Sequence, residues 1–282
     1  DNNFDPLADS VFSFTIEDDD AAGFTVVESG GSTGVSEGGS TDTFTVVLDA
    51  QPNSDVSFII HSNDAGEATV TGSLTFTSGN WDTPQTVTAT GVDDNLIDGS
   101  QSTTIDIAIY DGASDDNFDP LAPASVTITI ADNDTAGFTV VESGGSTGVS
   151  EGGSADAFTV VLDAQPNSDV VLNVTIAGDE ATVSTGTLTF TNANWNTAQP
   201  VTVTGVDDDI IDGNQNSIIL IVVNAGSSDN NFDALAAKTV TAATTDDDVA
   251  GFTVVESGGS TGVSEGGSTD TFTVVLDAQP NS

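Results

Sequence analysis

The segment GFTVVESGGSTGVSEGG occurs three times in this chain, beginning at Gly23, Gly137 and Gly251, so each copy starts 114 residues after the one before. Repetition at a fixed spacing is the signature of a tandem array, in which each repeat is one folding unit next to its neighbours in sequence. The function of such a chain lies in what a repeated module does, and not in a single active site.

The spacing divides the chain into two whole repeats, residues 22–135 and 136–249, between two partial ones. Residues 1–21 match the end of a repeat, and residues 250–282 match its beginning. The two partial pieces together are too short to enclose a hydrophobic core. We therefore expect the sequence to be a window on a longer polypeptide.

The charge balance excludes several classes of partner. The chain has 45 acidic residues against one basic residue, Lys238, and a formal net charge of -44. Nucleic acids and anionic membrane surfaces bind through basic groups, so neither is expected as a partner. The lack of Cys excludes disulfides and thiolate metal sites, and the longest apolar run, residues 218–223, is too short to cross a membrane. The charge instead implies a cationic partner.

Apolar residues alternate with Thr and Ser in short runs between Gly, Asn, Asp and Pro clusters, a pattern typical of half-buried strands. In the first whole repeat the pattern predicts seven strands, at residues 23–27, 43–48, 56–61, 74–77, 86–92, 104–110 and 125–130. Seven short strands without helical periodicity indicate an all-β fold of tandem seven-stranded immunoglobulin-like β-sandwiches. The side chains expected to face the two cores are Phe44, Val46, Leu48, Ile105, Ile107, Ile109, Val126, Ile128 and Ile130, then Phe158, Val160, Leu162, Ile219, Ile221, Val223, Val240, Ala242 and Thr244.

Acidic residues gather where the predicted topology brings separate connections together. Strands that run alternately up and down place the first, third and fifth connections, and the exit from the last strand, at one pole of a sandwich. The acids lie in the first and fifth connections and in the exit run. They are Asp18, Asp19, Asp20, Glu37, Asp93, Asp94, Asp98, Asp132 and Asp134 up to the end of the first whole repeat, and Glu151, Asp207, Asp208, Asp209, Asp212, Asp246, Asp247, Asp248 and Glu265 after it.

Carboxylates that converge raise one another's pKa unless a cation neutralises them. Ca²⁺ fits best, because it accepts many oxygen ligands in flexible geometry, whereas transition metals prefer His or Cys. The alternative is a set of solvated turn residues, since Asp is an ordinary turn former. We predict Ca²⁺ as the cofactor of the group as a whole, because like charges clustered between repeats gain nothing without a cation.

The repeats resemble Calx-beta domains, the modules first described in sodium/calcium exchangers and abundant in large bacterial surface proteins. The resemblance rests on the SEGG turn before the second strand, the LTFT segment, the run VTGVDDDIIDG and the DDD exit, and it spans each whole repeat. It implies Calx-beta-like sandwiches that bind calcium through acids at these motifs. Carried onto this chain, the implied ligands are Glu37, Asp93, Asp94, Asp98, Asp132 and Asp134, then Glu151, Asp207, Asp208, Asp212, Asp246, Asp247 and Asp248.

The chain departs from the family pattern in two places. Asn95 and Asn133 stand where the pattern has Asp in the first whole repeat, which implies fewer or more weakly held ions there. The third connection is a further source of ligands in the family, but its sequence aligns poorly between the repeats. The acids of that connection therefore stay open as ligands; they are Asp64, Glu67, Asp179 and Glu180.

Other features have simpler interpretations. His61 is the only His and is not repeated, which argues against a role as base or ligand. Trp81 and Trp195 are expected to seal the ends of the sandwiches, with sugar stacking as the alternative. The acids of residues 115–122 are predicted to form a turn, with an ion site at a repeat junction as the alternative. No Ser/His/Asp set or phosphate loop recurs with the repeat, so an enzyme is not expected.

These features together predict a structural, calcium-stiffened segment of a large extracellular protein, such as a bacterial surface adhesin, matrix component or filament. The expected partners are neighbouring repeats, with self-assembly into fibres and a surface or polysaccharide ligand left open. Two alternatives belong to other classes. One is a calcium-sensing regulatory module, which near-identical copies disfavour, and the other is a carbohydrate-binding array that uses the Trp loops.

Overall fold

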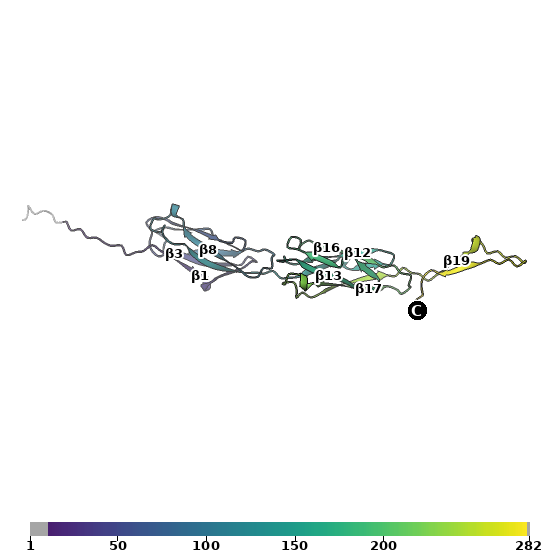
Figure 1. The fold of residues 1–282 in the computed structure, drawn as a ribbon. Coiled ribbons are helices and arrows are strands. Elements are labelled where there is room, and N and C mark those ends of the chain that lie inside the picture. The colour runs from purple at the N-terminus through teal and green to yellow at the C-terminus, as the bar shows by residue number, and fades with distance from the viewer. Residues whose placement is uncertain (1–10, 281–282) are drawn as a thin grey trace, which may run out of the picture. The chain divides into compact units, whose positions relative to one another are not determined.

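The computed structural model describes residues 11–280, in which β-strands and short 3-10 helices are joined by turns and irregular segments (Figure 1). The chain divides into two units. Among the described residues, unit 1 contains residues 11–94 and 99–133, and unit 2 contains residues 95–98 and 134–280. Within residues 11–280, no helix has the length and apolar character needed to cross a membrane.

Unit 1 is a sandwich of two sheets. One sheet has the strand order β1-β3-β7-β5, and the other has the order β2-β9-β8-β4-β6. All neighbouring strands are antiparallel except β2 and β9, which run parallel. The strands are β1 (Phe24–Glu28), β2 (Thr33–Ser36), β3 (Thr41–Leu48), β4 (Val56–Ser62), β5 (Ala68–Val70), β6 (Ser73–Phe76), β7 (Gln85–Gly91), β8 (Gln101–Ile109) and β9 (Ala124–Ala131).

Unit 2 repeats this topology, with sheets β10-β12-β16-β14 and β11-β18-β17-β13-β15, and also contains the hairpin β19-β20. The parallel pair is again the second strand against the last, β11 and β18. The strands are β10 (Phe138–Glu142), β11 (Thr147–Ser150), β12 (Ala155–Leu162), β13 (Val170–Ala177), β14 (Ala181–Val183), β15 (Thr187–Phe190), β16 (Gln199–Gly205), β17 (Gln215–Val223), β18 (Lys238–Thr245), β19 (Phe252–Glu256) and β20 (Phe272–Leu276).

The period-two alternation produces the two cores, because every second side chain of a strand faces the opposite sheet. All the side chains predicted to face inward are buried except that of Ile109, which packs half-buried at the edge of its core. The predicted all-β sandwich is therefore confirmed, and each of the seven predicted strands is present. The structure adds two short strands to each unit, β2 and β5 in unit 1 and β11 and β14 in unit 2. They are too short to show a periodic pattern.

The Trp residues lie where a sealing role requires them. Trp81 and Trp195 are half-buried and pack against the two cores. Their main-chain oxygens accept hydrogen bonds from the N–H groups of Leu48 and Leu162, both at 3.1 Å. The indole rings are thus part of the packing at the end of β3 and of β12.

The acids of residues 115–122 begin with a buried turn former. The Asp115 carboxylate accepts backbone N–H bonds from Asn53 at 2.6 Å, from Ser54 at 3.0 Å and from Asn117 at 3.0 Å. The hydrogen bond from Asn117 contributes most to lowering the pKa of Asp115. Asp115 therefore ties two connections together as a turn residue does.

Candidate metal centre

Three strand ends bring three carboxylates together in unit 2. Glu151 follows β11, Asp208 follows β16 and Asp248 follows β18. One carboxylate oxygen of each residue lies within 4.8 Å of those of the other two. We call Glu151, Asp208 and Asp248 the pole cluster.

The parallel pairing of β11 with β18 places Glu151 beside the exit run. Ser150 is paired with Thr245 in this ladder, and the N–H of Glu151 donates to the Thr245 carbonyl oxygen at 3.1 Å. The two segments therefore leave the sheet side by side. Asp248 follows Thr245 by three residues, close enough for its side chain to turn back toward Glu151.

Glycines allow the end of β16 and the exit run to lie close to the turn that carries Glu151. A Cβ atom on Gly205, the last residue of β16, would lie 2.1 Å from the carbonyl oxygen of Ser150. A Cβ atom on Gly152 would lie 2.6 Å from Oδ2 of Asp247. At Gly205 the neighbouring atom belongs to the backbone, so only a residue without a side chain permits that approach, whereas at Gly152 the neighbouring atom is the end of a side chain that can move. The SEGG turn and the Gly that ends β16 are thus the local sequence features that assemble the pole cluster.

The surroundings of the pole cluster disfavour the charged form of two of its carboxylates. Glu151 is 1% exposed, and burial raises its pKa, with the charges of Asp246 and Asp208 acting in the same direction. A hydrogen bond from the backbone of Asp247 partly opposes these effects. Burial also raises the pKa of Asp248, followed by the charge of Asp246. Two members of the cluster therefore resist carrying a negative charge in the absence of a cation.

Glu180 lies next to the pole cluster, although the sequence left its role open. Its main-chain oxygen accepts hydrogen bonds from the N–H of Val206 at 2.9 Å and from the Thr244 hydroxyl at 3.2 Å. These bonds hold the third connection against the ends of β16 and β18. Burial raises the pKa of Glu180, and so does the charge of Asp212, while a side-chain interaction with Glu151 lowers it.

Several carboxylate oxygens at this pole are buried without a hydrogen-bond partner among residues 11–280. They are Oε2 of Glu151, Oδ2 of Asp248 and Oδ1 of Asp212. A buried oxygen without a donor is costly, because it has lost its water and gained nothing in exchange. A hard cation would satisfy these oxygens, and a donor set made only of oxygens is the type that Ca²⁺ prefers.

No basic side chain neutralises the pole cluster. The single Lys of the chain, Lys238, donates to the carbonyl oxygen of Phe138 and lies 5.0 Å from the centroid of its ring. The single His of the chain, His61, lies with its Nε2 3.8 Å from Oδ2 of Asp106, which is not a member of the pole cluster. Among the described residues, no side chain therefore supplies positive charge to these acids.

Other predicted ligands in unit 2 lie outside the pole cluster. Asp246 serves the local turn, because its carboxylate accepts the N–H of Gly213 at 2.6 Å and that of Asp248 at 2.8 Å. Asp207 and Asp209 are exposed. The predicted residues outside the cluster are Asp207, Asp209, Asp212, Asp246 and Asp247.

Unit 1 has the same local construction. Glu37 is 1% exposed and donates its N–H to the Ala131 carbonyl oxygen at 3.1 Å. A Cβ atom on Gly91 would lie 2.1 Å from the Ser36 carbonyl oxygen, as at Gly205. A carboxylate oxygen of Glu37 lies within 4.8 Å of one of Asp94.

The remaining predicted ligands have varied surroundings. In unit 1, Asn133 donates its side-chain N–H to Asp93 at 3.3 Å, and Asp132 accepts the N–H of Gly99 at 2.8 Å. Asp98 and Asp134 fold with unit 2. Four residues are exposed and belong to no cluster among the described residues, namely Asp18, Asp19, Asp20 and Glu265. The assignment of the whole set as calcium ligands stays a prediction.

The raised pKa values predict an unusual response of the metal-free chain to pH. An acid whose pKa is raised by folding destabilises the fold above that pKa, so its contribution improves as pH falls toward its ordinary value. Glu151, Glu180 and Asp248 should therefore make the melting temperature rise as pH is lowered from 7 to about 5. Below that range, carboxylates whose pKa is lowered by hydrogen bonds, such as Asp156, lose their stabilising charge and the trend reverses.

Thermal melts of metal-depleted protein across this pH range test the prediction. General relief of charge repulsion also stabilises a chain of net charge -44, so a matched pair of variants is needed. Glu151→Gln should flatten the rise, whereas Asp169→Asn, which removes one exposed acid from another connection, should leave it intact. Equal slopes in both variants would show that Glu151 carries no raised pKa.

Comparisons with known proteins give fold-level similarity at low identity. No family model matches the chain, and no curated protein matches it. Similar solved structures include CBD12 from CALX1.2, at 15% identity and a TM-score of 0.29, covering 71% of this chain and 79% of that one. They also include the D0-D1 domain of Intimin, at 18% identity and a TM-score of 0.26, covering 78% of this chain and 94% of that one. Domains 4 and 5 of the S-layer protein SbsC match at 11% identity and a TM-score of 0.30, covering 80% and 100%. Similarity at this level carries no inference about function.

Proposed function

We propose that this chain is a structural segment of a large extracellular surface protein, built from tandem sandwiches that bind Ca²⁺ at one pole. The observation that carries the proposal is the Glu151 carboxylate, which is 1% exposed, has a buried oxygen without a hydrogen-bond donor, and lies beside two further carboxylates. The chain offers one basic side chain in all, and that side chain lies on Phe138.

Glu151, Asp208 and Asp248 are the residues that would hold the ion, with Glu180 and Asp212 near enough in the fold to contribute further oxygens. A bound Ca²⁺ supplies positive charge and satisfies buried oxygens. Each of these acids lies in a connection or in the exit run, so binding would fix the segments that leave the sandwich. Extracellular calcium is millimolar, which suits sites with dissociation constants of about 10⁻⁴ to 10⁻³ M.

The repetition favours a structural role over the two alternatives. An extending rod or fibre needs many similar modules, and here residues 250–282 reproduce residues 22–54 without change. Stiffening by calcium, secretion and a role in adhesion or fibre assembly are parts of this proposal. Carbohydrate binding through the Trp loops lacks support, because both indoles pack against the cores.

Thermal unfolding of the full chain with and without calcium tests the proposal. Occupancy at about 100 times the dissociation constant stabilises a site by about 2.7 kcal/mol, so the melting temperature should rise on the order of 10 °C. Mg²⁺ at the same concentration is the control, and it should give a smaller rise because it demands stricter geometry. Small-angle scattering of the same samples should show a smaller maximum dimension after calcium is removed.

Two results would contradict the proposal. A melting temperature that is the same in excess chelator and in about 0.1 M calcium, roughly 100 times the weaker dissociation constant, would remove the calcium assignment. A calcium-dependent melting temperature with an unchanged scattering curve would keep the binding site but remove the stiffening role.

A further inference from the structure

A short segment of the first sequence repeat folds as part of unit 2. Residues 95–98 lie in the fifth connection of the first repeat by sequence, yet they belong to unit 2. Leu96 pairs in a parallel bridge with Gln165, in the turn between β12 and β13. The N–H of Ile97 donates to the Gln165 carbonyl oxygen at 3.1 Å, and the N–H of Gln165 donates to the Asn95 carbonyl oxygen at 2.6 Å.

Side chains of unit 2 hold the same segment in place. The carbonyl oxygen of Ile97 accepts hydrogen bonds from the side-chain amides of Asn167 and of Asn231, the latter at 3.2 Å. The Ile97 side chain is 9% exposed and belongs to the hydrophobic core of unit 2. The segment is therefore held by main-chain hydrogen bonds, two amide donors and the burial of one aliphatic side chain. We call the surface that binds it, formed by Gln165, Asn167 and Asn231, the seat of residues 95–98.

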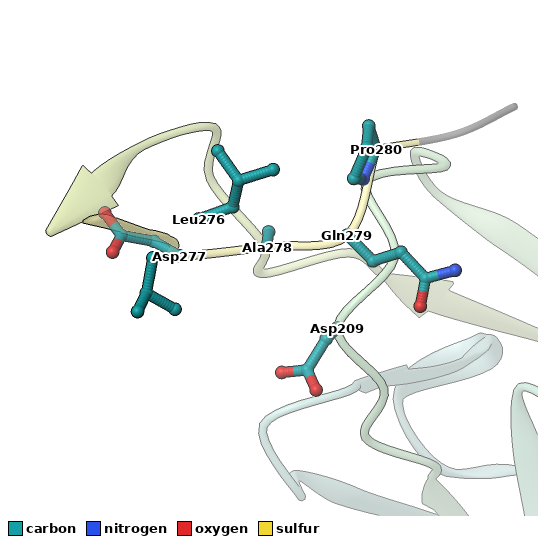
Figure 2. A pocket seen from close by; sticks show the side chains of 7 residues that line it. Asp209, Leu276, Asp277, Ala278, Gln279 and Pro280 are labelled. Carbon is teal, nitrogen blue, oxygen red and sulfur yellow. The ribbon is translucent and has the colours of Figure 1, made fainter. Parts of the chain in front are cut away.

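The arrangement recurs with the fifth connection of the second repeat. Ile210 forms a parallel bridge with Gln279, in the turn that follows β20. The N–H of Gln279 donates to the Asp209 carbonyl oxygen at 2.5 Å. The N–H of Ile211 donates to the Gln279 carbonyl oxygen at 3.4 Å. Figure 2 shows Asp209 beside the segment that runs from Leu276 to Pro280, where the two lie around a shared pocket. In both cases the fifth connection of a repeat is thus hydrogen-bonded to a turn that contains the corresponding Gln, Gln165 or Gln279.

Unit 1 has the corresponding seat as an open cleft. A cavity of about 230 Å³ is lined by Gln51, Asn53, Asn117 and Phe118, with Asp18 and Asp20 at its side. Subtracting the repeat spacing shows that the first four correspond to Gln165, Asn167, Asn231 and Phe232, which form the seat of residues 95–98 or lie next to it. Both amide side chains that donate to the carbonyl oxygen of Ile97 in unit 2 therefore have counterparts in unit 1.

We propose that this cleft of unit 1 binds the fifth connection of a preceding repeat, a loop with two adjacent aliphatic residues followed by Asp, as in Asn95–Asp98. Asn53 and Asn117 would donate to the carbonyl oxygen of the second aliphatic residue, and the main chain of Gln51 would pair with the residues around it. The inference deepens the proposed function by naming the surface that receives a neighbouring repeat, and it rests on the tandem arrangement but not on the calcium site.

Charge should modulate this contact. Asp18 and Asp20 line the cleft, and the loop itself carries acids. Like charges at short range repel and are screened by salt. Binding should therefore be weakest at low ionic strength in chelator and stronger in calcium or in about 0.15 M salt.

The test uses the full chain, labelled with ¹⁵N, and a capped peptide with the sequence of residues 92–100, VDDNLIDGS. A tethered loop acts at millimolar effective concentration, so the free peptide is titrated to several millimolar. We expect saturable shifts in the amide signals of Gln51, Asn53 and Asn117. The signals of Asn167 and Asn231 should not move, because their seat already holds residues 95–98.

Variants in either seat provide a matched comparison. Asn53→Ala and Asn117→Ala should each weaken peptide binding about fivefold, the usual effect of one hydrogen bond. The same changes at Asn167 and Asn231 should leave the affinity for the peptide unchanged. A peptide with Gly at the positions of Leu96 and Ile97 should not bind. The spectrum of each variant shows directly whether it has folded.

Three outcomes would overturn the inference: no shift at the highest peptide concentration, equal binding of the Gly peptide, or equal effects of the variants in the two seats. Titration in both calcium and chelator separates this inference from the proposed function. If the peptide binds but calcium does not stabilise the chain, the inference about the cleft holds and the calcium site is contradicted. If calcium stabilises the chain but the peptide does not bind, the calcium site holds and the inference about the cleft is contradicted.

Discussion

Replacing Glu151 by Gln should raise the melting temperature of unit 2 in chelator and lower it in calcium. Without a cation, the buried carboxylate of Glu151 is opposed by burial and by the charges of Asp246 and Asp208. A neutral amide removes that opposition, with a gain on the order of 1 kcal/mol. With calcium, the same change deletes a ligand and forfeits much of the roughly 2.7 kcal/mol that occupancy supplies.

Calorimetry of the full chain in both conditions measures this reversal of sign. Asp169→Asn is the matched control, since it removes one negative charge from an exposed position outside the pole cluster, and it should have a small effect of the same sign in both conditions. If Glu151→Gln lowers the melting temperature in both conditions, Glu151 is a structural hydrogen-bonding residue and not a ligand. If it raises the melting temperature in both, calcium does not bind there.

Gly205→Ala should destabilise unit 2 by about 1–3 kcal/mol or more, the range found for overpacked sites, and should also weaken calcium binding. The new Cβ atom would lie 2.1 Å from the Ser150 carbonyl oxygen and 2.6 Å from its carbonyl carbon. Both are backbone atoms, so the clash is relieved only if the end of β16 moves away from the turn that carries Glu151. Asp208 follows Gly205 by three residues and would move with it.

Gly148→Ala provides the control for this substitution. Gly148 lies in β11, has no atom within 4 Å of its Cβ position and does not have a positive φ. Chemical denaturation and calcium titration of the two variants should differ clearly, with Gly148→Ala close to the parent. Equal stability and equal calcium affinity in both would show that the close approach of β16 to the turn has no role in forming the pole cluster.

The sequence by itself determined the class of fold and the core. The repeat spacing and the alternation of apolar residues are local properties, and side chains such as Phe44, Ile107 and Ile128 alternate because a strand turns successive residues to opposite faces. The order of acidic motifs along the chain likewise predicted that separate connections would contribute acids at one pole. Glu151, Asp208 and Asp248 all belonged to that predicted set.

Which acids meet was decided by contacts between segments far apart in the chain. The register of β11 with β18 sets Glu151 beside the exit run, and the bare backbone of Gly205 sets Asp208 beside Glu151. Neither pairing leaves a periodic trace in the sequence. Glu180 was left open because its connection aligns poorly between the repeats. Its place depends on hydrogen bonds to Val206, just after β16, and to Thr244 in β18.

The fifth connection shows the difference most clearly. Its acids predicted a ligand loop that includes Asp98, and this stays a prediction. The tertiary structure adds that residues 95–98 belong to unit 2 and that Ile97 is buried in its core. Two adjacent aliphatic residues inside an acidic loop were the available signal, since a solvated loop gains nothing from them. The seat itself could not be predicted, because its donors, Gln165, Asn167 and Asn231, come from two turns that only the folded sandwich brings together.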